Sequence, residues 1–258
     1  MSGSPALLSS QNARLVAARR LTRRSARRET GRFLAEGAQA VRAALAAHAV
    51  AELFATAEAI ERHPDLTADA ARISAKDAAA LSETVTPQGL VAVCRRVDVP
   101  LDSALARAAL VAVLVEPNDP GNVGTVVRTA DAAGADAVVV AGGVDVYNGK
   151  AVRASAGSLF HLAVVVDVAA EDVLAAAAGF VTLATSGAGT VDLDELIDSD
   201  TLGAPTLWLF GSEAHGLSKP VLAGADRTVR IPIRGHAESL NLAAAAAICL
   251  YASARAHR

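Results

Sequence analysis

Aromatic residues are the scarcest class in this chain of 258 residues, since one tryptophan, two tyrosines and five phenylalanines make up only 3% of it. With so few rings, the core must be built from alanine, valine and leucine, which favours helices packed closely on a sheet over a ring-lined cavity. Hydrophobic residues reach 52% and charged residues 20%. That composition excludes a disordered chain, and the length suffices for one large or two modest domains.

Cysteine is also rare, and the two cysteines, Cys94 and Cys249, lie far apart in apolar stretches. They predict buried thiols in a reducing compartment rather than a disulfide. The six histidines show no metal-ligand spacing, so we expect no metal site. The N-terminus lacks the apolar core of a signal peptide. The longest uncharged run, between Glu238 and Arg255, contains polar residues and five successive alanines, which predicts a buried helix in a cytoplasmic protein rather than a membrane span.

Lysine is limited to three residues, so the positive charge resides on arginine, and it is unevenly distributed. Residues 1–32 hold eight arginines and one acidic residue, Glu29, a net charge of +7 that leaves about −10 for the remainder. A basic block on an acidic body predicts a polyanionic partner, for which nucleic acid is the first interpretation and a solvated helix face the alternative. The arginines expected to contact nucleic acid are Arg19, Arg20, Arg23, Arg24 and Arg27.

The first hundred residues predict a small α/β unit with a basic helix at its start. Strands are expected over residues 32–37, 50–56, 71–74 and 89–97, and helices over residues 10–28, 38–47 and 76–82. Residues 99–107 resemble a linker, because Pro100 interrupts the pattern there. The predicted domains are therefore residues 1–106 and residues 107–258.

Beyond residue 107 the pattern becomes regular. Continuous apolar runs, typical of strands that are covered on both faces, alternate with helical stretches. This alternation predicts an α/β domain with a mainly parallel sheet and helices on both faces, in which ligands bind beyond the carboxyl ends of the strands. Strands are predicted over residues 110–115, 137–141, 162–166, 181–185, 206–210 and 228–233, and helices over residues 124–133, 150–159, 170–178, 192–198, 220–223 and 239–256.

Two nucleotide-binding motifs are incomplete in this part of the chain. Residues 143–150 resemble a phosphate loop, but the spacing is one residue too long, and Ala151 replaces the required serine or threonine. Residues 187–189 (Gly-Ala-Gly) follow a predicted strand, but Asp192 occupies the position of the third glycine. A dinucleotide-dependent oxidoreductase is therefore disfavoured, and no Gly-x-Ser-x-Gly hydrolase motif occurs.

Two loops at predicted strand ends carry polar side chains. The loop of residues 116–128 opens a helix, where Asn122 can cap the N-terminus and Arg128 can lie near the strand ends. A second loop begins at Gly211, which permits close approach of a ligand to the backbone, and Glu213 follows at the mouth of the strand. Each loop also fits a plain turn and cap, and the residues alone leave that alternative open.

A third loop, residues 231–241, joins the last predicted strand to the last predicted helix. Ser239 is the expected N-cap of that helix. Asn241 is expected in the first turn of an alanine- and leucine-rich helix, where a buried amide needs a hydrogen-bonding partner.

Together the three loops resemble the signature motifs of the SpoU (TrmH-like) RNA 2′-O-ribose methyltransferases of the SPOUT superfamily. The matching segments are DPGNVGTVVRTADAAG at residues 119–134, FGSEAHGLS at residues 210–218, and IPI followed by SLNLAAAAAI within residues 231–248. Two N-terminal segments, FLAEG at residues 33–37 and TPQGLVAV at residues 86–93, resemble the RNA-binding domain that precedes many SpoU catalytic domains.

The resemblance implies a C-terminal α/β-knot, a mainly parallel sheet with a deep trefoil knot, preceded by a smaller α/β RNA-binding domain. It implies a homodimer whose partner completes each active site, and methyl transfer from S-adenosylmethionine to a ribose 2′-hydroxyl, of ribosomal RNA in preference to transfer RNA. The alternatives are a transfer-RNA 2′-O-methyltransferase and a non-catalytic RNA-binding or ribosome-assembly protein on the same fold. The implied cofactor-binding residues are Leu183, Thr185, Gly187, Leu209, Gly211, Ile231, Ile233 and Leu240.

The resemblance also implies a catalytic set. In the reaction, the ribose hydroxyl attacks the methyl carbon of the sulfonium in line, a step that needs alignment and no metal. Because a guanidinium stays protonated in proteins, we interpret Arg128 as a group that grips a phosphate and positions the hydroxyl, rather than as the base. Glu213 is expected to hold this guanidinium bidentately. The implied catalytic residues are Asn122, Arg128, Glu213, Ser239 and Asn241.

Overall fold

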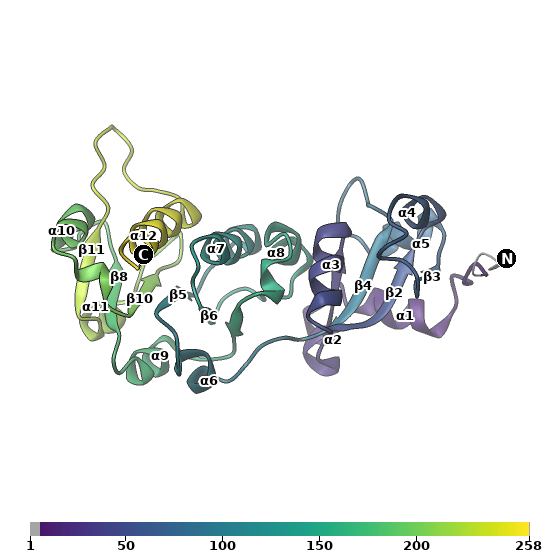
Figure 1. The fold of residues 1–258 in the computed structure, drawn as a ribbon, viewed down its shortest axis with the longest axis horizontal. Helices are drawn as coiled ribbons and strands as arrows, with labels where there is room; N and C mark the ends of the chain where they lie inside the picture. The colour runs from purple at the N-terminus through teal and green to yellow at the C-terminus, as the bar shows by residue number, and fades with distance from the viewer. Residues whose placement is uncertain (1–5, 258) are drawn as a thin grey trace. The chain divides into compact units, whose positions relative to one another are not determined.

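A computed structural model describes residues 6–257, which form two compact units (Figure 1). Unit 1 extends to Val97 and also includes Tyr147–His161. Unit 2 comprises Asp98–Val146 and the chain from Leu162 onward. The division expected between residues 106 and 107 thus falls inside unit 2, and a segment expected in the second domain belongs to unit 1.

Unit 1 is built around a four-stranded sheet in the order β1-β4-β2-β3. The strands are β1 (Arg32–Glu36), β2 (Val50–Ala55), β3 (Ala71–Arg72) and β4 (Leu90–Arg95), and the helices before Val97 are α1 (Ala13–Arg20), α2 (Arg24–Thr30), α3 (Ala38–Ala46), α4 (Ala57–Arg62) and α5 (Ala75–Ala80). β4 pairs antiparallel with β1 and β2, whereas β2 and β3 are parallel. The prediction of a single helix over residues 10–28 is wrong. The backbone at Arg23 is extended, and it separates α1 from α2.

A cluster of rings holds Tyr147–His161 in unit 1. The buried ring of Phe33 lies 4.6 Å from the ring of Tyr147 and 5.9 Å from that of Phe160, measured between centroids. The N–H of Val97 donates to the Tyr147 hydroxyl at 3.1 Å, and the Arg96 guanidinium lies over the same ring. This segment forms α8 (Gly149–Ala154) and a short 3-10 helix (Ser158–Phe160) instead of the single helix predicted over residues 150–159. Burial of these scarce rings against β1 explains why the segment joins unit 1.

Unit 2 contains a seven-stranded sheet in the order β7-β6-β5-β10-β8-β11-β9, and every strand pair in it is parallel within the described residues. The strands are β5 (Leu110–Val115), β6 (Ala137–Ala141), β7 (Ala163–Val165), β8 (Val181–Thr185), β9 (Val191–Asp192), β10 (Thr206–Phe210) and β11 (Arg227–Arg230). The predicted mainly parallel sheet is confirmed. The strand predicted over residues 228–233 extends too far, because Pro232 has no N–H to continue the ladder.

Helices cover both faces of this sheet, as predicted (Figure 1). One face carries α7 (Pro120–Ala132), α10 (Leu193–Asp198) and α12 (Leu242–Ala256), with a 3-10 turn at Thr201–Gly203, and the other carries α6 (Leu101–Leu105), α9 (Ala170–Ala176) and α11 (Lys219–Gly224). Buried Trp208 of central strand β10 donates its Nε1–H to Ser253 of α12 at 2.9 Å. Residues 99–107, predicted as a linker, contain α6. The trefoil knot stays a prediction.

The caps of α7 and α12 differ from the predicted ones. Asp119 is the N-cap of α7, with its carboxylate accepting the N–H of Asn122 at 3.3 Å, and Pro120 occupies the first helical position. Asn241, and not Ser239, caps α12, since its Oδ1 accepts the N–H of Ala243 at 2.8 Å. Because Asp119 satisfies the end of α7, the Asn122 side chain is available for other contacts.

The structure also bears on two simpler expectations. Both cysteines are buried and free, as predicted, and burial raises the pKa of Cys94 to about 12. Among residues 6–257, no helix is both long enough and apolar enough to cross a membrane.

Candidate active site

A chain of side-chain hydrogen bonds joins the three loops singled out in the sequence. Asn241 donates through Nδ2 to Oδ1 of Asn122 at 3.2 Å, and Asn122 donates through its own Nδ2 to Oε1 of Glu213 at 2.7 Å. The backbone N–H of Asn118 donates to the second carboxylate oxygen of Glu213 at 3.1 Å. We call Asn122, Glu213 and Asn241 the three-loop network. It brings together residues that are up to 119 positions apart in the sequence.

The fold explains why these three side chains meet. α7 and α12 pack against each other on one face of the sheet, and α12 also contacts β5 and β10. Asn122 lies in the first turn of α7, Asn241 caps α12, and Glu213 follows the carboxyl end of β10. Two helix N-termini and one strand end therefore converge at the edge of a parallel sheet where ligands usually bind.

The carboxyl group of Glu213 is held in its ionised form. Burial opposes ionisation, but hydrogen bonds from the Asn122 side chain and from the backbone N–H groups of Glu213, Asn118 and Asp119 outweigh it. The pKa of Glu213 consequently lies below its ordinary value. At neutral pH Glu213 is an acceptor that fixes the Asn122 amide, with Nδ2 toward the carboxylate and Oδ1 toward Asn241.

Gly211 allows the loop after β10 to fold back on itself. Ser212 and Gly216 form an antiparallel bridge, and the N–H of Gly216 donates to the carbonyl of Ser212 at 2.9 Å. A Cβ atom on residue 211 would overlap the backbone of Gly216 and Leu217. Glycine is therefore required at this position. The sequence predicted that it lets a ligand approach the backbone, whereas in the structure it lets residues 216 and 217 of the same loop approach.

A cavity of about 410 Å³ lies next to the three-loop network, within the size range of small-molecule sites. Its walls come from the ends of β8, β10 and β11 and from the loops that follow them. Six of the eight expected cofactor-binding residues line it, namely Thr185, Gly187, Gly211, Ile231, Ile233 and Leu240, together with Glu213 and Ser239 of the expected catalytic set.

The other two expected cofactor-binding residues, Leu183 and Leu209, do not line the cavity. Both side chains are completely buried in the interior of β8 and β10, two positions before Thr185 and Gly211. Residues of these strands reach the cavity only at the carboxyl ends. Residues two positions earlier are covered by helices. Their side chains are closed off from the cavity, and their role in cofactor binding stays a prediction. The Leu209 carbonyl accepts the Thr185 hydroxyl at 2.9 Å.

Several cavity residues were missed by the reasoning from sequence. They belong to the same loops and strand ends as the predicted ones, so membership of those loops was the signal that could have found them. The missed residues are Ser212, His215, Gly216, Leu217, Val229, Glu238, Leu242 and Ala245.

Arg128 does not lie in the cavity wall. It is exposed on α7, nearly two turns beyond Asn122, and it makes no hydrogen bond or ion pair with any residue between 6 and 257. The expected bidentate pair between Arg128 and Glu213 is wrong within this chain, because the Glu213 carboxylate instead accepts from Asn122 and Asn118. The guanidinium is consequently available to a group outside the chain.

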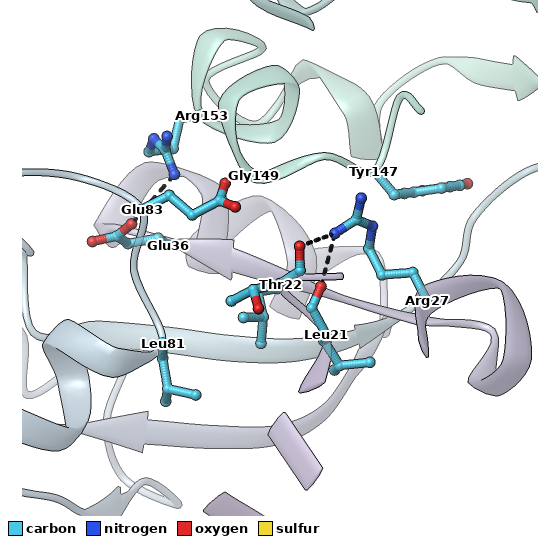
Figure 2. A pocket seen from close by; sticks show the side chains of 10 residues that line it. Leu21, Thr22, Arg27, Glu36, Leu81, Glu83, Tyr147, Gly149 and Arg153 are labelled. Carbon is cyan, nitrogen blue, oxygen red and sulfur yellow. Dashed lines mark hydrogen bonds and ion pairs between the residues drawn. The ribbon is translucent and has the colours of Figure 1, made fainter. Parts of the chain in front are cut away.

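Two arginines expected to contact nucleic acid have structural roles in unit 1. Arg27 is only 4% exposed, and its Nη1 donates to the carbonyls of Leu21 and Thr22 at 2.9 Å each (Figure 2). Those carbonyls lie at the break between α1 and α2, where no helical N–H reaches them. The expectation is therefore wrong for Arg27. Arg19 is bound by the carboxylate of Asp77 but stays partly exposed, so its contact with nucleic acid stays a prediction.

The remaining arginines of that expected set are exposed. Arg20 forms an ion pair with Glu29 at 3.5 Å, in which both side chains are largely in solvent. Arg23, at the turn between α1 and α2, has no partner among the described residues. Arg24 is exposed as well. The basic surface of unit 1 is therefore smaller than the arginine count suggests.

Two sequence families match this chain. Residues 109–251 match the SpoU rRNA Methylase family, and residues 12–92 match the MRM3-like substrate binding domain. One similar protein is the 23S rRNA (guanosine(2553)-2′-O)-methyltransferase RlmP of Bacillus subtilis, which is 34% identical over 94% of this chain and 96% of that protein.

Solved structures resemble the whole chain. One is the SpoU methyltransferase AviRb from Streptomyces viridochromogenes in complex with the cofactor AdoMet, with a TM-score of 0.83, 33% identity and coverage of 95% of this chain and 98% of that chain. Another is an AdoMet-bound rRNA methyltransferase from Sinorhizobium meliloti, with a TM-score of 0.82, 30% identity and 98% coverage of both chains.

The hydrogen bond from Asn122 to Glu213 can be tested by titration. Replacing Asn122 with alanine removes a donor to the ionised carboxylate, so the pKa of Glu213 should rise, as followed by carbon NMR of glutamate carboxyl groups. Because the folded-state pKa lies below the unfolded one, the stability that Glu213 contributes is lost as the pH falls through the folded-state pKa, and Asn122→Ala should weaken that loss.

Asn118→Ala is the matched control, since Asn118 donates through its backbone N–H and keeps that donor after substitution. An unchanged Glu213 pKa in Asn122→Ala, or an equal rise in Asn118→Ala, would contradict the assigned network.

Proposed function

The chain belongs to the SpoU rRNA methylase family, and on this premise we propose that it transfers a methyl group from S-adenosylmethionine to a ribose 2′-hydroxyl of RNA. The observation that carries the proposal is the three-loop network beside the 410 Å³ cavity. It joins the motif residues of three separate loops next to a space that is large enough for a small cofactor. A non-catalytic RNA-binding protein would need no such pairing of network and cavity.

The volume and the charge of the cavity suit S-adenosylmethionine. Ile231, Ile233 and Leu240 offer apolar surfaces for the faces of the adenine ring, and loop backbone groups are available for its polar edge. Two carboxylates, Glu213 and Glu238, line the cavity, whereas no lysine or arginine is among its lining residues. A negative lining suits a ligand that carries a sulfonium and an ammonium group. The AdoMet complexes of two similar proteins support the same cofactor here.

The residues around the cavity have different roles in the proposed reaction. The bound cofactor supplies a methyl group that is activated by its positive sulfur, so the protein must chiefly align the hydroxyl with it. Asn122 and Asn241, each fixed by a hydrogen-bonding partner, and exposed Ser239 orient the ribose. We assign Arg128 to a phosphate next to that ribose, because a guanidinium binds phosphate oxygens bidentately and stays protonated.

Ribosomal RNA is the target that we favour over transfer RNA. Similar proteins of nearly full coverage are named as rRNA methyltransferases, and residues 12–92 match a substrate binding domain. A dedicated binding domain suits a large structured RNA that is recognised by shape. We also expect the reaction to occur in the cytoplasm, where such RNA is found.

A homodimer and a knotted cofactor loop complete the proposal. Unit 2 has an apolar groove in which Ile197, Ile248 and Tyr251 are 44%, 41% and 61% exposed. An exposed apolar surface of this kind favours association with a second copy in a twofold dimer. We propose further that the partner completes each active site, a role that fits the unpartnered Arg128 guanidinium. The knot is inferred from the same membership.

Arg128 gives the direct test of the catalytic proposal. Arg128→Ala should lower the rate of methyl transfer to RNA by about a hundredfold or more, while the affinity for S-adenosylmethionine, measured by calorimetry, stays within a few-fold. Arg107→Ala, a change of another exposed arginine of unit 2, is the control and should leave both quantities unchanged. Near-normal turnover of Arg128→Ala would refute the assigned role.

The dimer is tested by a charge placed in the apolar groove. Tyr251→Glu should shift the protein from dimer to monomer in sedimentation experiments, and the monomer should lose methyl transfer. Ala79→Glu, on an exposed position of α5 in unit 1, is the charge-matched control. If Tyr251→Glu stays dimeric, the second copy does not bind at this groove.

The exposed arginines of unit 1 predict a change in salt dependence. Deleting residues 14–32 would also remove buried Leu15 and Leu21, so point changes are preferable. Arg20→Ala combined with Arg23→Ala should weaken RNA binding and lower the slope of log affinity against log salt by about 0.7–0.9 for each phosphate that the variant no longer neutralises. Arg62→Ala, exposed on α4, should leave the slope unchanged, and an unchanged slope in the double variant excludes phosphate binding by Arg20 and Arg23.

A further inference from the structure

A groove of about 300 Å³ lies in unit 1, and it shares no lining residue with the cavity described above. It opens between α1, the end of α2 and the sheet, where α1 covers the sheet incompletely. α1 turns Ala17 and Ala18 toward this space, and such short side chains leave the groove unfilled. The residues that matter for its chemistry are Arg14, Ala17, Thr30, Arg32, Glu52 and Val93.

Glu52 and Arg14 are held in place at the groove. The Nε of Arg14 donates to Oε2 of Glu52 at 2.8 Å, and the Arg14 guanidinium lies 5.7 Å from the centre of the buried Phe54 ring. The Glu52 side chain is 23% exposed, so the ion pair is partly shielded from water. Within the described residues no hydrogen bond reaches Oε1 of Glu52. A preformed acceptor thus faces the groove.

Two arginines, Arg14 and Arg32, line the groove together with this acceptor. Arg32 lines the groove and is exposed, and its side chain has no hydrogen bond or ion pair with any residue that the structure describes. Phosphates are attracted to Arg32, whereas the Glu52 carboxylate repels them from the floor. The charges therefore suit a ligand with a phosphate at the rim and an uncharged, hydrogen-donating group inside.

We propose that this groove binds one unpaired guanine base of the RNA substrate. The inference rests on the proposed function, because RNA supplies the ligand. Sequence-specific recognition of RNA generally uses unstacked bases held against protein side chains. The floor formed by Ala17 and Val93 takes the face of the base, and Arg14 and Arg32 lie at its edges.

Hydrogen-bonding capacity selects guanine among the bases. A carboxylate offers about four acceptor positions, so Glu52 keeps acceptors after binding Arg14. Guanine presents two adjacent donors, N1–H and the 2-amino group, to such an acceptor. Uracil presents a single donor between two carbonyl oxygens, which the carboxylate repels. Adenine and cytosine each present one amino group beside an unprotonated ring nitrogen. Two adjacent donors match the carboxylate best.

The test uses the full chain and fluorescently labelled oligouridine that carries one central guanosine, inosine or adenosine. Ala17→Phe fills the groove from an exposed position of α1 and should weaken binding of the guanosine oligomer about tenfold, the effect of losing one bound base. Val16→Phe is the matched control, because Val16 is 46% exposed on the same helix and does not line the groove. It should change the affinity by less than about twofold, as is usual for surface substitutions.

Glu52→Gln tests the selection of the base without filling the groove. The natural chain should bind guanosine about tenfold more tightly than inosine, which lacks the 2-amino group, or adenosine, as expected for a base-specific contact. Glu52→Gln should abolish this preference, because its amide offers one acceptor in place of the carboxylate.

The outcomes separate the two proposals. Equal binding of the three oligomers, or equal losses in Ala17→Phe and Val16→Phe, would overturn the guanine site. If binding and methyl transfer persist while either result is found, only the groove inference fails. If the natural chain neither binds RNA nor transfers a methyl group, the proposed function itself fails. Tight binding of an acidic peptide that Ala17→Phe abolishes would assign the groove to a protein partner and overturn the RNA inference.

Discussion

The amide of Asn122 is the interaction on which the site depends, because it accepts from Asn241 and donates to Glu213 at the same time. A single amide that uses both its donor and its acceptor fixes the relative position of two helix N-termini and one strand end. The arrangement works because Asp119 already caps α7 and thereby frees the Asn122 side chain. Ionised Glu213 then sets the orientation of the amide, so charge at one loop determines geometry at the two others.

Much of the fold was predictable from the sequence, since continuous apolar runs such as residues 110–115 and 206–210 mark strands that are covered on both faces. Periodicity reports burial, but not which sheet a segment joins. The aromatic contacts that place Tyr147–His161 beside β1 arise from residues more than a hundred positions away. Cap positions were missed for a related reason, because whether Ser239 or Asn241 caps α12 depends on local dihedral angles.

The candidate site was predictable as three loops, but less so as individual side chains. Leu183 and Thr185 lie on the same strand, yet only the one at the carboxyl end reaches the cavity. The surface charge of unit 1 was likewise harder to predict than its arginine content. Counting them gives a basic block, whereas Arg27 serves two backbone carbonyls and Arg19 serves Asp77. The charge that remains outside is concentrated at fewer positions, among them Arg23 and Arg32.

Mapping the transferred methyl group tests the central claim most directly. The full chain would be incubated with labelled S-adenosylmethionine and total RNA from cells that lack the gene, and the labelled nucleotide identified by mass spectrometry after alkaline hydrolysis. The account predicts label on one ribose 2′-oxygen of ribosomal RNA, which blocks alkaline cleavage at that position. Label on a base, or no label although the donor binds, would contradict it.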